Sequence, residues 1–221
     1  SGEQVQSRKL LLATGVMDEL PPIPGVEEHF GISVFQCPYC DGWEQKDAPI
    51  AVFGRGKRGF ELTRAMTAWS RDIVLCTHGA PGLSRVELGS LAANQIRVEP
   101  ARIVKLEGCG GRLERILFED GRSIERRALF FNLPSHSQSQ LARSLGCQFT
   151  SSGAIRCGRY EASSVPGVFV AGNILRDVQL SIVAAAEGAK AAFGINRALT
   201  REDFATRTGA PPAVDHPGPE S

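Results

Sequence analysis

Two cysteines separated by two residues, with an acid directly after the second, are the first residues in this chain whose spacing suggests chemistry. They are Cys37, Cys40 and Asp41, in the stretch FQCPYCDGWE. Two intervening residues allow a disulfide to form, and a neighbouring carboxyl can carry a proton to a thiol that is being released. The spacing therefore favours a redox pair with Asp41 as acid/base.

Two other interpretations of this stretch stay open. A structural zinc site needs four ligands, and the pair supplies two. The remaining cysteines and the four histidines show no metal-ligand spacing, so we expect no metal. The other alternative is two unpaired thiols in a loop. The remaining cysteines are expected to be buried or half-buried free thiols, as in a reducing compartment: Cys76, Cys109, Cys147 and Cys157.

A glycine-rich turn, Gly54-x-Gly56-x-x-Gly59, follows an apolar run over 50–53. Apolar residues with helical spacing come next, and a second apolar run covers 72–76. Strand, turn, helix and strand in this order are typical of a dinucleotide-binding βαβ unit, in which the backbone and the helix N-terminus approach a pyrophosphate. The alternative is a tight turn in a plain α/β sheet.

The end of the second predicted strand does not decide which dinucleotide is bound. A ribose-binding acid would sit near Thr77 or His78, and neither position is acidic. No arginine cluster for a 2′-phosphate follows the strand, and His78 would serve only in part. The choice between NADH and NADPH therefore stays open at this stage.

The other predicted elements complete an α/β chain. We expect strands at 9–14 and 168–171, a hairpin around Asp120-Gly121, and a long Ala-rich helix over 178–199. The proline-punctuated segment 19–31 is predicted as a loop, and 201–221 as a flexible tail.

Composition excludes several classes of partner. The chain has 221 residues and a net charge of +1, so it carries no basic footprint for nucleic acid or an anionic membrane. No apolar run approaches the roughly 20 residues that span a bilayer. No signal-peptide pattern opens the chain, so we expect a cytoplasmic protein.

Several motifs together resemble the thioredoxin reductase family of flavin-dependent pyridine-nucleotide disulfide oxidoreductases, in its CPYC-type branch. In chain order they are ATG at 13–15, IPG at 23–25, CPYCDG at 37–42, the glycine-rich turn, SVPGVFVAGN at 164–173 and the helix with AAAEGAKAA. The resemblance runs over about residues 8–199. It implies FAD and NADP as cofactors, with NAD as the alternative. It also implies a thioredoxin-like protein or a small-molecule disulfide as substrate, and a homodimer.

The resemblance also assigns roles to residues. Cys40 matches the cysteine that faces the flavin, Cys37 the thiol that attacks the substrate disulfide, and Asp41 the acid/base. The glycines of the turn match the nicotinamide-nucleotide site. The flavin would be contacted by Thr14, Gly15, Gly172, Asn173 and Gln179, the last at the start of a helix aimed at the ring.

The sequence departs from the family pattern at three places. Asn173 replaces an aspartate, and Thr77-His78-Gly79 stands where the family has a basic pair. The third departure is larger, because the family's earlier glycine-rich turn for the FAD pyrophosphate does not occur in these 221 residues.

The resemblance predicts two Rossmann-like domains, with the NAD(P) domain (35–150) inserted into a truncated FAD domain (1–34 and 151–200). The predicted activity is electron transfer from NAD(P)H through FAD to the Cys37–Cys40 disulfide and on to an external disulfide. The alternative is a redox-incompetent nucleotide-binding fragment that cannot hold FAD.

Overall fold

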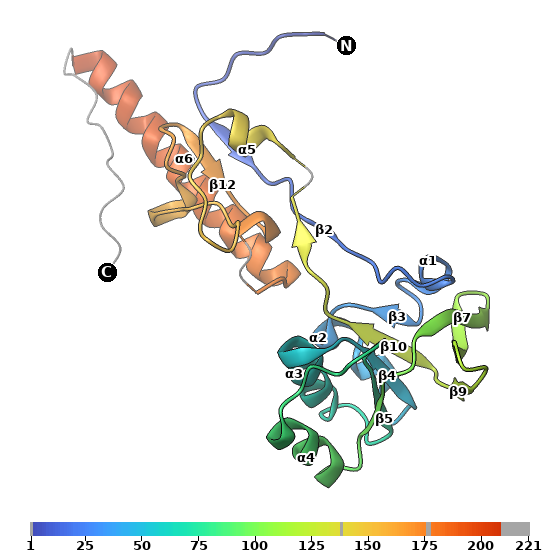
Figure 1. Ribbon diagram of the computed structural model, residues 1–221. Coiled ribbons are helices and arrows are strands. Elements are labelled where there is room, and N and C mark those ends of the chain that lie inside the picture. Colours follow the sequence, from blue (N-terminus) through green and yellow to red (C-terminus); the bar gives the residue numbers. More distant parts are fainter. Residues whose placement is uncertain (1, 138, 176–177, 209–221) are drawn as a thin grey trace. The chain divides into compact units, whose positions relative to one another are not determined.

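The computed structural model describes residues 2–137, 139–175 and 178–208 (Figure 1). The chain divides into two compact units. The central unit is Asp18–Pro134, and the flanking unit combines Ser1–Met17 with Ser135–Ser221. Both contain parallel β-structure together with helices, which confirms the predicted α/β class.

A five-stranded parallel sheet forms the middle of the central unit, with strand order β3-β10-β4-β5-β6. Its central strands read as continuous apolar runs because both faces of the sheet are covered. The strands are β3 (Val34–Phe35), β4 (Ile50–Phe53), β5 (Ile73–Cys76), β6 (Arg97–Glu99) and β10 (Ala128–Phe131).

The two faces of this sheet have different covers. Val52 and Leu75 pack with Leu62 and Met66 of α3 (Gly56–Met66), and α4 (Arg85–Ala93) contributes Leu91 to the same cluster. The opposite face packs against an antiparallel three-stranded sheet, which also contains the predicted Asp120-Gly121 hairpin. That sheet consists of β7 (Ile103–Cys109), β8 (Arg112–Phe118) and β9 (Ser123–Glu125).

The strand order of this sheet reverses at β4. The chain runs outward on one side from β4 to β5 and β6, while β10 and β3 lie on the other side. In open parallel sheets, ligands bind at the carboxyl ends of the strands where the order reverses. The segments after β3, β4 and β5 all leave from this edge, and they contain Cys37, the glycine-rich turn and His78.

Short elements connect the sheet strands. The predicted loop over 19–31 contains a helical turn, α1 (Val26–His29), whose Val26 is buried against Leu106 in the core. The other short elements of the central unit are α2 (Pro38–Asp41) and the 3₁₀ turn η1 (Trp43–Gln45). At the unit boundary, β2 (Met17–Asp18) pairs with β11 (Ser135–His136).

The flanking unit is built on two parallel strands and one long helix. Strand β1 (Leu10–Leu12) pairs with β12 (Val168–Val170), and Phe169 packs against Ala191 of α6 (Ser181–Thr208). Its remaining elements are α5 (Leu141–Ser144) and the 3₁₀ turns η2 (Arg159–Glu161) and η3 (Asn173–Leu175).

The observed division corrects the predicted domain boundaries of 35 and 150. Residues 18–34 belong to the central unit, because β3 is an edge strand of its sheet and Val34 lies in its core. Residues 135–150 belong to the flanking unit, where Ala142 and Cys147 pack with Leu12. Which cofactor each unit binds stays a prediction.

The predicted tail over 201–221 is also corrected in part. Helix α6 continues through Thr208, and ion pairs from Arg8 to Asp203 and from Lys9 to Glu202 tie its last turns to the segment before β1. Residues 209–221 lie outside the described part of the chain. Among the helices that the structure describes, none is long and apolar enough to cross a membrane.

Candidate active site

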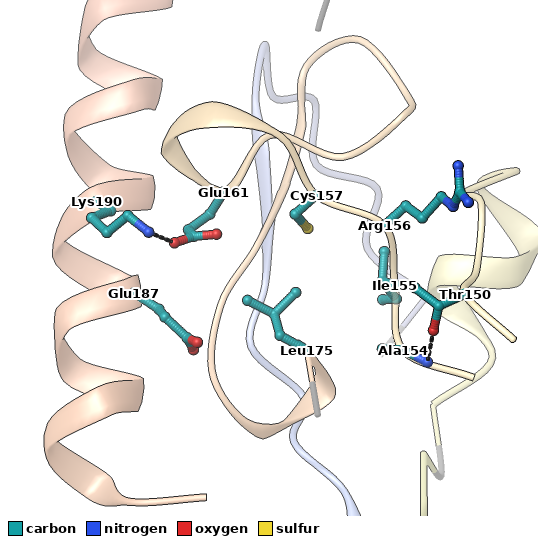
Figure 2. Close-up of a pocket in the computed structure, with 9 residues that line it drawn as sticks. All are labelled: Thr150, Ala154, Ile155, Arg156, Cys157, Glu161, Leu175, Glu187 and Lys190. Atoms are coloured by element: carbon teal, nitrogen blue, oxygen red, sulfur yellow. Dashed lines mark hydrogen bonds and ion pairs between the residues drawn. The ribbon is translucent and has the colours of Figure 1, made fainter. Parts of the chain in front are cut away.

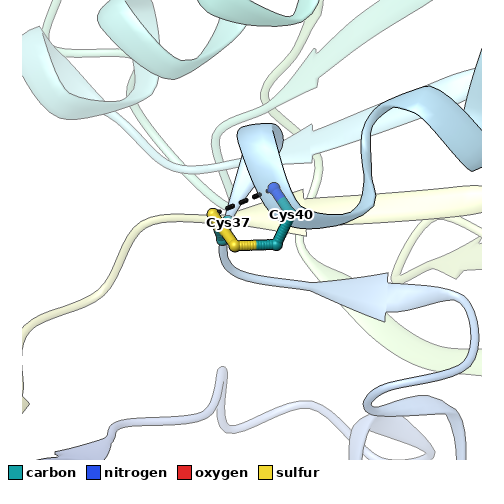
Figure 3. The surroundings of a disulfide bond; sticks show 2 residues. All are labelled: Cys37 and Cys40. Atoms are coloured by element: carbon teal, nitrogen blue, oxygen red, sulfur yellow. Dashed lines mark hydrogen bonds between the residues drawn. A yellow bond between two sulfur atoms is a disulfide. The ribbon is translucent and has the colours of Figure 1, made fainter. Parts of the chain in front are cut away.

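The predicted pairing of Cys37 and Cys40 is confirmed. The two form a disulfide across the first turn of α2, with their Cα atoms 5.3 Å apart (Figure 3). Cys37 follows the end of β3 by two residues, so the disulfide lies at the carboxyl edge of the parallel sheet. One strand, β10, separates β3 from β4, which carries the glycine-rich turn. The segments that carry the disulfide and the glycine-rich turn therefore leave the sheet two strand spacings apart, which is about 10 Å.

The local sequence determines this geometry. Cys37 is the N-cap of α2 in an extended backbone conformation, and Pro38 occupies the first helical position, where it loses no hydrogen bond. The Cys37 Sγ accepts a hydrogen bond from the Cys40 backbone N–H at 3.2 Å. The same N–H would stabilise a thiolate on Cys37 after reduction. This contact favours the predicted role of Cys37 as the attacking thiol, which stays a prediction.

Gly42 holds the redox turn against the rest of the central unit. A Cβ at this position would meet the Pro38 carbonyl oxygen at 2.3 Å and the Trp69 indole nitrogen at 2.5 Å. Only glycine permits this approach. On the other side of the pair, the Gln36 side chain donates a hydrogen bond to the Leu133 carbonyl beyond β10.

The surroundings of the disulfide combine an exposed aromatic surface with a half-buried acid. Tyr39 and Trp43 are 75% and 65% exposed, and Cys40 is exposed as well. Asp41 is half-buried, and burial, assisted by the charge of Glu44, raises the pKa of its carboxyl above the ordinary 3.8. A raised pKa keeps a proton available for transfer to a departing thiolate.

Replacing Asp41 with asparagine is expected to separate stability from catalysis. A carboxyl whose pKa is raised on folding stabilises the fold below its ordinary pKa, and this contribution is lost as pH rises through the raised value. Asp41→Asn should therefore unfold at a higher denaturant concentration than the parent at pH 7. This difference between the two unfolding midpoints should disappear when the pH is lowered below the ordinary pKa of aspartate. Loss of the acid/base should slow disulfide reduction by roughly 10²–10⁴-fold.

The matched control for Asp41→Asn is Asp47→Asn. Asp47 is exposed a few residues further on, and its left-handed backbone (φ 60°) accepts asparagine. Turnover in Asp47→Asn should stay at the parent value. Equal losses in the two variants would remove Asp41 from the proton path.

The glycine-rich turn has the shape that a dinucleotide requires. Gly59, in the first turns of α3, lies so close to Gly54 that an added Cβ would meet the Gly54 carbonyl carbon at 2.6 Å. Gly56 has a left-handed φ of 59° and donates its N–H to the Pro81 carbonyl at 2.8 Å. The next N–H groups of the helix have no carbonyl within it to bind. This cradle fits a pyrophosphate.

Substitutions at two helical glycines should have opposite effects. Gly59→Ala forces backbone apart and should destabilise the chain by about 1–3 kcal/mol while weakening nucleotide binding. Gly89 lies in α4 with nothing within 4 Å of an added Cβ. Gly89→Ala should stabilise by about 0.5–1 kcal/mol and leave binding unchanged. Urea unfolding and nucleotide titration measure both, and equal stabilities for the two variants would refute the close packing at Gly59.

His78 lies at the carboxyl end of β5, as predicted, in a left-handed conformation with φ 49°. Its Nδ1 accepts a hydrogen bond from the Ile103 N–H at 3.1 Å, and its ring lies edge-on to Phe53. Burial, together with the charges of Arg102 and Arg55, lowers the pKa of the imidazole. Sequence patterns did not identify these two arginines, because they come from separate loops.

The residues predicted to contact the flavin belong to the flanking unit. Thr14 and Gly15 follow β1, while Gly172 and Asn173 follow β12, so the pairing of these parallel strands brings the four together at one sheet edge. Gln179 is exposed two residues before α6 begins, and its amide donates to the Ser135 hydroxyl at 3.4 Å. The cysteine pair and the glycine-rich turn lie in the other unit.

Glu187 supports Gly172 and was missed in the sequence. Its carboxylate accepts the Gly172 backbone N–H at 2.7 Å. In the sequence, the only indication of this role for Glu187 is that it is an acid within an alanine-rich helix. Beside it, a pocket of 320 Å³ is lined in part by Cys157, Glu161 and Lys190, the last two forming an ion pair (Figure 2). Burial raises the pKa of the Cys157 thiol to about 12, which makes it unreactive.

The remaining cysteines largely follow the prediction. Cys76 and Cys147 are buried and Cys157 is half-buried, but Cys109, at the end of β7, is exposed. All four are free thiols. Within the described ranges, no three His, Cys, Asp or Glu side chains come together as a metal-binding group.

The two cofactors differ in how well the chain fits them. The central unit offers a complete strand–turn–helix cradle for NAD(P). The described part of the flanking unit offers two parallel strands and the Gly172 turn, but the chain's single Gly-x-Gly-x-x-Gly motif lies in the central unit. In the described part of the flanking unit, the structure therefore shows no second strand–turn–helix cradle of this kind, and the flavin contacts stay a prediction.

Comparison with known proteins agrees with this architecture. The family model for pyridine nucleotide-disulphide oxidoreductases matches residues 1–188. A thioredoxin reductase of Claviceps purpurea, tcpT, is 31% identical over 181 residues, covering 78% of this chain and 56% of its own length. A thioredoxin reductase of Aquifex aeolicus is 26% identical and covers 90% of this chain and 64% of its own.

Solved structures give the same result. A putative thioredoxin reductase, TrxB, from Bacillus anthracis has a TM-score of 0.84 at 35% identity, covering 89% of this chain and 66% of its own. The structure titled HlmI has a TM-score of 0.85 at 33% identity, covering 92% and 66%.

The chain spans between half and two thirds of the length of these proteins. The matched family model nevertheless covers most of the chain, and it includes the cysteine pair and the glycine-rich turn. The chain belongs to the pyridine nucleotide-disulphide oxidoreductase family, among its thioredoxin reductase-like members.

Proposed function

We propose that this chain carries the NAD(P) site and the redox disulfide of a flavin-dependent disulfide oxidoreductase. The observation that carries the proposal is the Cys37–Cys40 disulfide at the same sheet edge as the Gly54–Gly59 cradle, within one unit. FAD, when bound, supplies the relay of two electrons from NAD(P)H to this disulfide. Thr14, Gly15, Gly172, Asn173 and Gln179 would contact it.

The reduced cysteine pair then reduces an external disulfide in two exchanges. The Cys37 thiolate attacks one substrate sulfur, which forms a mixed disulfide and releases the other sulfur as a thiolate. Asp41 gives that thiolate a proton. The Cys40 thiolate next attacks the Cys37 sulfur, which releases the second substrate thiolate and restores the Cys37–Cys40 disulfide. The substrate gains the two electrons that the dithiol loses.

The substrate is a thioredoxin-like protein or a small-molecule disulfide. The relatives named as thioredoxin reductases support the first, and the exposed Tyr39 and Trp43 offer either one an apolar platform beside Cys40. The proposal also includes a cytoplasmic location, which the four free thiols support. A homodimeric state is proposed from the family alone.

A second function has one observation in its favour. The chain contains a single glycine-rich cradle, so it can act as a nucleotide-binding module without flavin. The colour of the purified protein separates the two, because bound flavin is yellow.

The proposed function is tested by NAD(P)H-dependent disulfide reduction. The protein is assayed with FAD, in a form extended by an upstream strand, glycine-rich turn and helix, with thioredoxin and a small aromatic disulfide as substrates. Reduction of either one supports the proposal. A flavin-loaded protein that oxidises NAD(P)H with an artificial acceptor but reduces neither disulfide would overturn it.

A further inference from the structure

Strand β6 ends in a buried carboxylate that a single arginine holds. Glu99 is the last residue of β6, and its side chain is buried. The two terminal nitrogens of Arg122, in the turn between β8 and β9, donate to its two carboxylate oxygens at 2.9 and 3.0 Å. Two parallel charge-assisted hydrogen bonds of this kind fix direction as well as distance. The pair therefore clamps the end of β6 to the three-stranded sheet.

The turn around Asp120 prepares Arg122 for this contact. The Asp120 carboxylate accepts the Arg122 Nε at 2.7 Å and the Arg122 backbone N–H at 3.0 Å. The guanidinium also lies over the Phe118 ring, 5.8 Å from the ring centroid. Although the side chain is exposed, contacts at its backbone and at its guanidinium hold it in place. The clamp therefore forms at a low cost in side-chain conformational entropy.

The place of β6 in the parallel sheet explains why its end needs a side-chain contact. β6 is an edge strand of three residues, and within the described ranges only β5 pairs with it. Backbone pairing therefore holds β6 on one side only. The clamp supplies a second attachment at the carboxyl end of the strand, which is the edge of the sheet where ligands bind.

Backbone hydrogen bonds lead from the clamp to the glycine-rich turn. The residue after Glu99 is Pro100, whose carbonyl accepts the Gly79 N–H at 2.7 Å. The loop that contains Gly79 continues to Pro81, whose carbonyl accepts the Gly56 N–H at 2.8 Å. Gly56 is the second glycine of the turn and the first residue of α3. A shift of the clamped strand end would therefore move the backbone that receives the pyrophosphate.

We infer that Glu99 and Arg122 are positioning residues for the nucleotide: their clamp keeps the loop after β5 in the place where it supports the glycine-rich turn. The inference rests on the proposed nucleotide site at the Gly54–Gly59 cradle. It gives the three-stranded sheet a part in nucleotide binding without any contact to the ligand. Because the clamp acts on backbone that any dinucleotide would meet, its effect is equal for NAD⁺ and NADP⁺.

Binding of NAD⁺ and NADP⁺ to the purified 221-residue chain tests this inference without flavin. Both nucleotides are titrated by calorimetry against the parent, Arg122→Gln, Glu99→Gln, the double variant and Arg115→Gln. Arg115 is the matched control, because it is an exposed arginine of β8 that pairs with Glu107 at 2.8 Å within the same three-stranded sheet. Urea unfolding of each variant shows whether the titrated protein is folded.

Each single variant should bind both nucleotides roughly tenfold more weakly than the parent. The double variant should lose no more than either single variant, because the two residues act through one contact. Arg115→Gln should bind as the parent does. Glu99→Gln keeps an oxygen that can accept the Ala101 N–H, so it decides the test if Arg122→Gln does not fold.

Folded variants that unfold at a lower urea concentration but bind both nucleotides like the parent would overturn the inference, because the clamp would then only stabilise the fold. A loss confined to NADP⁺ would also overturn it, since Arg122 would then contact the nucleotide itself. Both outcomes leave the proposed nucleotide site intact. Binding of neither nucleotide by the parent would overturn that site and the inference together.

Discussion

A flavin-loaded form with Cys37→Ser should lose disulfide reduction completely, because no thiolate is left to attack the substrate. It should keep NAD(P)H oxidation with an artificial electron acceptor, since that reaction does not pass through the disulfide. Cys40→Ser should also lose turnover but for another reason, as the mixed disulfide on Cys37 then has no resolving partner. Steady-state assays with both acceptors distinguish the two activities.

The matched control for these variants is Cys109→Ser. Cys109 is an exposed free thiol in the same unit. Its replacement should leave both activities at the parent value, which shows that loss of a thiol alone has no effect. Disulfide reduction near the parent rate in Cys37→Ser would mean that the cysteine pair is not the redox centre.

The second large effect concerns flavin. The purified 221-residue chain is expected to bind FAD weakly or not at all, because the flanking unit, in the residues that the structure describes, has the turns after β1 and β12 and no pyrophosphate cradle. Backbone N–H groups at a glycine-rich turn and helix N-terminus normally hold that group. Fusion of a strand, glycine-rich turn and helix that can hold the pyrophosphate should confer stoichiometric yellow cofactor.

Absorbance at the flavin maximum, taken with protein concentration after gel filtration, measures this directly. Gly59→Ala serves as a control within the extended form, since it disturbs the central cradle and should spare flavin content. Stoichiometric FAD in the unextended chain would refute the prediction, and it would show that the flanking unit holds the whole cofactor.

The sequence predicted the parts of the fold in which local pattern and tertiary structure agree. The glycines of the turn, the apolar run before it and the helical spacing after it are all local signals, and β4, α3 and β5 lie where they indicated. The CxxC spacing likewise predicted a disulfide that forms within a single helical turn. The hairpin at Asp120-Gly121 depends on two turn residues, and it too was predicted.

Features that depend on distant pairing could not be predicted in this way. Strand β3 is two residues long, and only its pairing with β10 assigns residues 18–34 to the central unit. The loop over 19–31 contains α1 because burial of Val26 against Leu106 stabilises a turn that its prolines and glycine disfavour locally. Helix α6 extends past residue 200, where its acids Glu202 and Asp203 pair with Lys9 and Arg8 from the other end of the sequence.

In the candidate site, too, only residues that are close together in the sequence could be predicted. Cys37, Cys40, Asp41 and the three glycines are contiguous in sequence, so spacing identified them. His78 meets the Ile103 N–H and the ring of Phe53 only because separate segments fold together, and no pattern along the strand-end segment indicates these contacts. Glu187 supports Gly172 across 15 residues of sequence for a similar reason.

Capture of a mixed disulfide tests, without any cofactor, whether Cys37 is the attacking thiol of a redox pair. The Cys40→Ser and Cys37→Ser variants of the 221-residue chain are reduced, freed of reductant and mixed with oxidised thioredoxin or an aromatic disulfide. Peptide mapping then locates the adduct. We expect rapid capture on Cys37 in Cys40→Ser, and much slower capture on Cys40 in Cys37→Ser. Equal rates at the two positions, or capture mainly on Cys109 in both variants, would contradict it.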